Sequence, residues 1–423
     1  MNENELMGQM KISKAVAKMA VPSVISSLVT VVYNMADTFF VGQTGDPLQV
    51  AAVSLTNPIF ILMMAFANMF GMGGSAVLSM ALGAKNEKRA RQTSSFVTYA
   101  SLIVGILFAV ILIVFMDPIL AVFGANAETY EFAKGYTFHI SYGAPFIIWS
   151  AAASFIVRAE GSSKEAMIGS MIGTVANIIL DPIFISVLNQ GTAGAAIATT
   201  IGNILASGYY LWYFLKKSKV LSLKWSDFTV RESILTKVCG SGLPTAIFSA
   251  LMSVSTIVLN QLLVVYGNDP VAAIGIVFKA NMFITFLQMG IANGVQPLLG
   301  YNYGAGNMKR FRGVESYTKK WCLVAGIAAT AMYFLFREQI IRRFISDNEV
   351  VFYGVDMLVA YMLSGPVIGF LFVNMNCMQS VGRALPATIL SVLRQGILLI
   401  PLLYLLRALF GLNGVILGQS VTD

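Results

Sequence analysis

Long apolar segments alternate with short polar breaks along the whole chain. Many of these segments reach or exceed the ~20 residues that a helix needs to cross a ~30 Å hydrocarbon core. The breaks predict transmembrane spans at residues 13–41, 49–82, 92–116, 131–156, 165–188, 193–215, 234–265, 272–300, 316–336, 350–378 and 386–409, with a twelfth beginning near 412. The pattern is typical of an all-α polytopic membrane protein with twelve transmembrane helices.

The positive charges sort to one side of the predicted membrane. Most Lys and Arg residues lie in the breaks that contain residues 11–18, 85–91, 216–237 and 309–320, and the cluster at 337–343 is the main exception. Because cytoplasmic loops carry an excess of Lys and Arg, these breaks and the N-terminus are predicted to be cytoplasmic. We therefore expect a multi-pass protein of a prokaryotic plasma membrane.

The sequence also repeats itself. The segment Gly83–Arg91 returns as Gly304–Arg312, an offset of 221 residues, and Pro145 matches Pro366 at the same offset. Because both halves begin on the cytoplasmic side, the repeat is predicted to be parallel, with its axis along the membrane normal. We expect two six-helix lobes, an N-lobe at 1–220 and a C-lobe at 221–423.

The repeat predicts that the last helix is incomplete. The sixth span of the first half continues well past Gly194, whereas the chain ends at Asp423, soon after the matching Gly414. We expect the twelfth helix to be cut short in this sequence.

Composition agrees with a membrane protein and argues against other classes. Of the 423 residues, 57% are hydrophobic and only 11% are charged, whereas soluble domains carry about 25% charged residues. The net charge of +8 comes from the basic loops, so no nucleic-acid partner is expected. The three Cys and one His have no ligand spacing, which predicts neither a structural metal nor a disulfide framework.

No catalytic motif stands out along the chain. It contains no His-Glu-x-x-His, no Gly-x-Ser-x-Gly and no Walker loop, so it is predicted to be neither an enzyme nor a user of ATP or a cofactor. Channels are also built from repeats, but no repeated filter motif occurs. Two facing lobes favour a carrier that works by alternating access.

Polar residues inside the predicted spans mark a candidate site. Asp-Pro occurs four times, and three of the pairs lie at span ends, where Asp caps a helix and Pro fits its first turn. Asp181-Pro182 differs because apolar residues continue after it. Asn177 lies one turn before Asp181, so both side chains face one way. Pro182 leaves the carbonyl of Ile178 without its amide donor and is expected to bend the helix.

Four oxygen-bearing side chains are predicted to lie at one depth. The helical rise places Asp37 and Asp181 ~21–25 Å from the inner surface, and Thr199 at a similar level. An ionised carboxylate in lipid costs on the order of 2.5–3.5 kcal/mol, and two would repel each other unless a cation or a proton lies between them. Carboxylate, amide and hydroxyl oxygens suit Na⁺, or the acids can carry H⁺. The structural alternative is a protonated Asp that is hydrogen-bonded to its own helix.

Several ordered motifs resemble one known family. Ala36-Asp-Thr-Phe-Phe-Val-Gly42, Gly83-Ala-Lys-Asn86, the Asn177/Asp181-Pro182 pair and Gly300-Tyr-Asn-Tyr-Gly-Ala305 together are similar to the multidrug and toxic-compound extrusion (MATE) transporters. The resemblance covers nearly the whole chain. It implies two lobes that open as a V and export cationic amphipathic compounds by antiport with Na⁺ or H⁺.

The resemblance also implies functional residues. Family members bind the coupling ion at positions that match Asp37, Asn177, Asp181 and Thr199, and bending of the first helix is expected near Pro22. Further residues are candidates for the substrate cavity: Asn34, Phe146, Gln261, Lys279 and Arg394. We expect a monomer in the lipid bilayer. The alternative function is a lipid-linked oligosaccharide flippase, which should need a cavity rich in Arg and Lys.

Overall fold

The computed structural model describes residues 5–43, 46–231, 233–345 and 347–422. The first half consists of η1 (Glu5–Gln9), α1 (Ile12–Gly42), α2 (Pro47–Gly83), α3 (Glu87–Val114), α4 (Met116–Val122), α5 (Tyr130–Ala159), α6 (Ser163–Pro182), the π-helical turn η2 (Ile183–Val187) and α7 (Gly191–Lys216). The second half consists of η3 (Trp225–Asp227), α8 (Ile234–Val264), α9 (Asn268–Gly304), α10 (Met308–Leu335), α11 (Arg337–Arg342), α12 (Asn348–Met362), α13 (Gly365–Ser380), α14 (Ala384–Val392), the π-helical turn η4 (Leu393–Leu398), α15 (Leu399–Phe410) and α16 (Leu412–Thr422). The all-α architecture expected from the sequence is confirmed.

The helices reproduce the predicted spans closely. Within the described residues, eight helices are long and apolar enough to cross a membrane, and the pair α12 and α13 forms a ninth span that is bent by 47°. With α7, α10 and α16, each half contributes six helical segments. The bend was not predicted. It falls at Leu363 and Ser364, directly before Pro366 in the first turn of α13, where proline cannot donate to the preceding turn.

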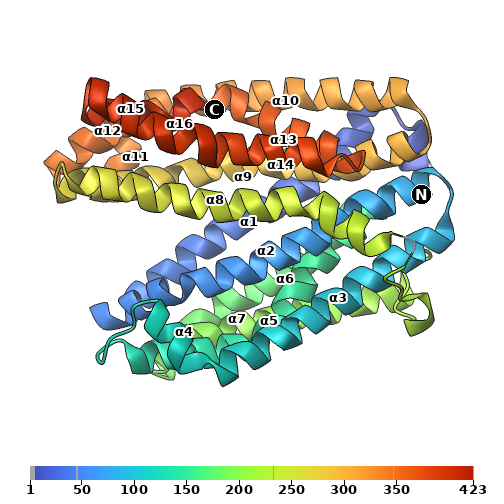
Figure 1. The fold of residues 1–423 in the computed structure, drawn as a ribbon, viewed down its shortest axis with the longest axis horizontal. Coiled ribbons are helices and arrows are strands. Elements are labelled where there is room, and N and C mark those ends of the chain that lie inside the picture. The colour runs from blue at the N-terminus through green and yellow to red at the C-terminus, as the bar shows by residue number, and fades with distance from the viewer. Residues whose placement is uncertain (1–4, 44–45, 232, 346, 423) are drawn as a thin grey trace.

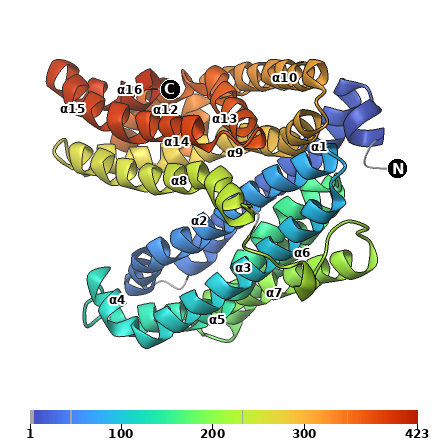
Figure 2. The ribbon, with the colours of Figure 1, turned by 45° about the vertical axis from the view of Figure 1, so that its right-hand side comes forward.

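The two halves form two lobes that meet at one end (Figures 1 and 2). We call α1–α7 the N-lobe and α8–α16 the C-lobe. Across the lobe boundary α1 packs on α9, α2 packs on α8, and α2 also contacts α9. The first described element, η1, lies at the end where the lobes converge, and the opposite ends of the lobes are spread apart.

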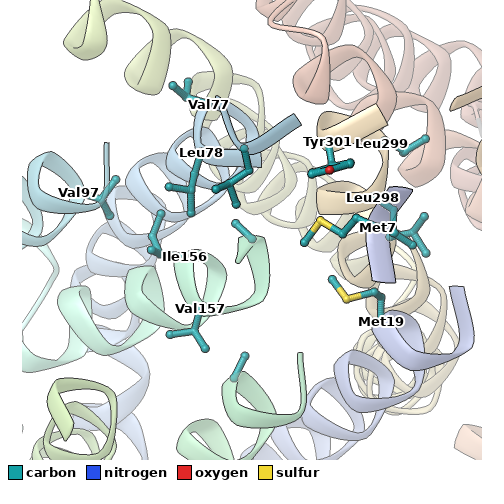
Figure 3. Packing of buried hydrophobic residues seen from close by; sticks show 14 of the residues in the cluster. Met7, Met19, Val77, Leu78, Val97, Ile156, Val157, Leu298, Leu299 and Tyr301 are labelled. Carbon is teal, nitrogen blue, oxygen red and sulfur yellow. The ribbon is translucent and has the colours of Figure 1, made fainter. Parts of the chain in front are cut away.

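The buried apolar side chains explain this shape. The largest cluster joins both lobes near the converging end, and Figure 3 displays Met7 and Met19 beside Leu298 and Tyr301, with Val77 and Ile156 opposite. A second cluster, from Leu259 to Ile416, belongs to the C-lobe alone, and the third belongs to the N-lobe alone. Burial of apolar surface therefore stabilises the contact between the lobes at one end only.

Two glycines related by the repeat allow the lobes to approach closely there. A Cβ atom on Gly83 would lie 1.9 Å from the carbonyl oxygen of Tyr301, and one on Gly304 would lie 2.1 Å from that of Met80. Both distances are far shorter than any van der Waals contact. The repeat offset of 221 residues relates Gly83 to Gly304 and Met80 to Tyr301, so the two close approaches are equivalent by symmetry.

The segment between the lobes is fastened to the N-lobe. The Tyr99 hydroxyl on α3 donates to the carbonyl of Leu223 (2.7 Å), and the Ser95 hydroxyl donates to that of Lys224 (3.0 Å). The ring of Phe228 stacks on that of Trp225 with a centroid distance of 4.8 Å. The chain therefore leaves the N-lobe only just before α8.

Candidate functional site

The four residues that the sequence places at one depth come together inside the N-lobe. Asp37 lies on α1, Asn177 and Asp181 lie on α6, and Thr199 lies on α7. The Asn177 amide lies 3.1 Å from the Thr199 hydroxyl. When the amide oxygen faces Thr199, its nitrogen donates to Asp181 Oδ2 at 2.9 Å. These hydrogen bonds join α6 to α7, and Asp37 on α1 lies near enough for its charge to interact with that of Asp181.

The two carboxyl groups share this cluster. Asp181 is fully buried and Asp37 is partly buried, and the groups lie close enough for their charges to interact. Asp181 Oδ1 has no hydrogen-bond partner among the described residues. Because a buried polar atom without a partner is costly, this oxygen is a candidate ligand for a bound cation or the place of a proton.

The donor set fits a monovalent cation or a proton. It combines two carboxylates with the neutral amide of Asn177 and the hydroxyl of Thr199, which are hard oxygen ligands. Asn177 can turn its amide end for end, so it can offer its oxygen to a cation or its nitrogen to a carboxylate. The cluster therefore suits either coupling ion that the sequence allows.

Two tyrosines belong to the same cluster and were missed by the sequence analysis. The hydroxyl of Tyr33 lies beside Thr199 and within electrostatic range of the Asp37 carboxylate. Tyr136 on α5 lies within electrostatic range of both carboxylates. Tyr33 precedes Asp37 by one helical turn, and that spacing could have identified it. No local signal marks Tyr136, because only the docking of α5 brings it to the site.

The helix beside the site is irregular, in agreement with the proline. The α-helical pattern of α6 ends at Pro182 and the π-helical turn η2 follows. The amide of Leu188 donates to the carbonyl of Ile183 (2.9 Å), which is an i to i+5 bond. Pro22 lies inside α1, which continues as a helix on both sides of it. Both prolines remove one backbone donor, and bending at either position stays a prediction.

A central cavity of about 820 Å³ lies between the lobes. Its walls combine aromatic and Met side chains with many hydroxyl and amide groups, among them Tyr33, Phe60, Met64, Tyr210, Phe248, Met289, Asn293 and Asn376. Asn177 and Thr199 also line it. The N-lobe cluster therefore adjoins the cavity directly, through the amide and hydroxyl that contact each other.

The cavity contains only some of the residues predicted to line it. Asn34 and Arg394 are lining residues. The prediction is wrong for Phe146, Gln261 and Lys279, which have exposed side chains outside the cavity lining. Adjacent helix positions point in different directions, about 100° apart. A residue on a helix that lines the cavity can therefore point away from the cavity. Lys279 does so, although other residues of α9 line the cavity.

Comparison with known proteins agrees with this architecture. The family model MatE matches twice, at residues 22–183 and 244–405. The chain is 34% identical over 414 residues to the multidrug export protein MepA of Staphylococcus saprophyticus, which covers 97% of this chain and 90% of that protein. The multidrug export protein MepA of Staphylococcus aureus is 33% identical over the same length, with the same coverage.

Solved structures of transporters have the same fold. The crystal structure of MATE in complex with MaL6 superimposes with a TM-score of 0.94 at 25% identity, over 100% of this chain and 94% of that one. The crystal structure of MATE in the straight conformation gives a TM-score of 0.92 at 25% identity, with the same coverage. The double match of the family model, the curated relatives and the shared fold agree, and this chain belongs to the MatE family of transporters.

Proposed function

We propose that the protein exports amphipathic organic compounds by antiport with Na⁺ or H⁺ and that the coupling ion binds at Asp37, Asn177, Asp181 and Thr199. The observation that carries this proposal is the contact between the buried acidic cluster and the central cavity. Asn177 and Thr199 contact each other and also line the cavity, so a change at the carboxylates alters the wall that a substrate touches.

The energetics of the cluster favour binding of a cation. An ionised carboxylate within the membrane costs on the order of 2.5–3.5 kcal/mol, and the repulsion between Asp37 and Asp181 adds to that cost. A bound Na⁺ or a proton removes much of both penalties. Since Asp37 lies on α1 and Asp181 on α6, the bound ion would hold these helices together.

Coupling follows if ion and substrate stabilise different states. Binding of the ion draws α1 toward α6 and α7 and turns the Asn177 amide, which changes the cavity wall. Pro22 weakens α1 locally, and we propose that the helix bends there as the cluster tightens. A ligand shifts an equilibrium only by its differential affinity for the two states, and the effect is reciprocal. The ion should therefore weaken substrate binding, and the substrate should weaken ion binding.

Three further observations support export from the cytoplasm and a broad range of substrates. The basic breaks and η1 lie at the converging end (Figures 1 and 2), which supports a cytoplasmic location for that end of the protein in a plasma membrane. The similar proteins of two Staphylococcus species are named multidrug export proteins. Phe, Met and Tyr side chains line a roomy cavity, which suits aromatic amphipaths of varied shape. Organic cations are the class that the family resemblance suggests.

Dye exchange in everted vesicles tests the proposal. Transport of a fluorescent dye is measured under an imposed Na⁺ gradient and, separately, under an imposed pH gradient. Asp37→Asn and Asp181→Asn should abolish the transport driven by whichever gradient works in the wild type. Asp269→Asn is the matched control, because Asp269 also precedes a proline but lies exposed in the first turn of α9. Undiminished gradient-driven transport in both site variants would reject the assignment.

A further inference from the structure

The central cavity carries formal charges of one sign. Among its described lining residues, the only ionisable side chains that are charged at neutral pH are Arg158 and Arg394, and no Asp or Glu lines it. We propose that the C-lobe wall contains a subsite for an anionic group, a carboxylate or phosphate, centred on Arg394. This inference rests on the proposed export function and adds to it a preference for amphipaths that carry an anionic group, zwitterions included.

Arg394 lies on the cavity wall, where a substrate group inside the cavity could reach it. It lies on η4, ten residues after α14 begins, which is about 15 Å along the helix and near the middle of the span. Its side chain is only 5% exposed. Ionisable residues at such depths face cavities or substrate paths. The low dielectric of a buried position strengthens the attraction to an anion.

The surroundings orient the guanidinium on the cavity wall. Its central carbon lies 5.5 Å from the ring centroid of Phe248, which also lines the cavity. The backbone carbonyl of Gln395 accepts a hydrogen bond from the Ser255 hydroxyl (2.5 Å), and this contact fixes the π-helical turn η4 to α8. A guanidinium presents donors in a planar fork that matches both oxygens of a carboxylate or phosphate.

Polar groups beside Arg394 extend the subsite. Gln395 is 4% exposed and its Oε1 has no hydrogen-bond partner among the described residues. Gln395 and Ser255 both line the cavity. A buried amide with unused hydrogen-bonding capacity is costly unless a ligand or water completes it. The C-lobe wall therefore offers a charged fork together with neutral groups that can bind the remaining atoms of a ligand.

The repeat reveals that the lobes have opposite polarity at this level. At the offset of 221 residues, Arg394 corresponds to Gly173, while Leu398 and Leu402 correspond to Asn177 and Asp181. At this level the N-lobe thus contributes acids beside the cavity and the C-lobe contributes a cation, while the other cavity cation, Arg158, lies near the end of α5 in the N-lobe. A zwitterionic compound can turn its cationic end toward the N-lobe and its anionic end toward Arg394. A compound with only a cationic group gains nothing from the C-lobe charge.

A pair of dyes that differ by one charge tests this subsite. Rhodamine 110 has a free carboxylate and is zwitterionic, and rhodamine 123 is its cationic methyl ester. Binding of both to the purified full chain in detergent is followed by fluorescence anisotropy, without an ion gradient. The wild type should bind rhodamine 110 about tenfold more tightly, as expected for one charge-assisted contact. Arg394→Gln should remove this preference and leave the affinity for rhodamine 123 unchanged.

The controls separate a local contact from other effects. Lys279→Gln removes a C-lobe cation outside the cavity lining and should leave the preference intact. Retained binding of rhodamine 123 by Arg394→Gln demonstrates that this variant is folded. The proposal is wrong if the wild type prefers the ester, if Arg394→Gln weakens both dyes equally, or if Arg158→Gln removes the preference as fully. Loss of gradient coupling alone, with the preference retained, would reject only the transport proposal.

Discussion

The close approach of the lobes at Gly83 and Gly304 leads to a quantitative prediction. A Cβ on Gly83 would lie 1.9 Å from the Tyr301 carbonyl oxygen, so the backbones must separate by about 1.5 Å to reach the 3.4 Å of ordinary contact. Overpacking of this kind costs about 1–3 kcal/mol, which changes a conformational equilibrium about 5- to 150-fold. Gly83→Ala, and likewise Gly304→Ala, should therefore populate states with the converging end opened.

Pulsed electron paramagnetic resonance can measure this opening. Spin labels at Lys88 and Lys309 occupy exposed, repeat-related positions at the starts of α3 and α10, in a background without native cysteines. Both glycine variants should increase the population at longer label distances. Gly240→Ala is the control, because nothing lies within 4 Å of a Cβ there. An unchanged distribution in both variants, or an equal change in the control, would refute the reasoning.

Two further predictions concern buried polar contacts near the converging end. The carbonyl of Met7 accepts hydrogen bonds from Asn302 Nδ2 (3.1 Å) and Arg310 Nε (3.0 Å), while the Met7 side chain is fully buried. Asn302→Ala should therefore loosen η1 and speed tryptic cleavage after Lys11. An unchanged cleavage rate would contradict this prediction. Glu160 is buried and accepts from the hydroxyls of Ser218 (2.6 Å) and Tyr213 (2.8 Å). Glu160→Ala should cost about 1–3 kcal/mol and lower the melting temperature in detergent, whereas Glu87→Ala, which removes an exposed ion pair, should leave it unchanged.

The spans and the repeat were readable because they depend on local, additive signals. Hydropathy over some twenty residues decides whether a helix can cross a bilayer, and the turn at Asn86 returns with the same cap at Asn307, each accepting from the amide three residues later. The bend before Pro366 was not readable. Its repeat counterpart Pro145 lies within the unbroken helix α5, so proline alone does not determine where a helix breaks.

The functional site also contains residues that the sequence could predict and residues that it could not. Their predicted depth was enough to group Asp37, Asn177, Asp181 and Thr199, because residues at the same depth on neighbouring helices lie close together. Depth carries no information about the direction in which a side chain points. That is why Tyr136 was missed, and why Lys279 was assigned to a cavity that it does not line.

Reciprocal binding tests the central claim most directly. The affinity of the purified protein for a transported dye is measured without the coupling ion and at a saturating concentration of it, in the wild type, Asp37→Asn and Asp181→Asn. The account predicts that the ion weakens dye binding by about fivefold or more in the wild type and has no effect in either variant. The account would be contradicted if the ion left the dye affinity of the wild type unchanged, or if it weakened dye binding in both variants as much as in the wild type.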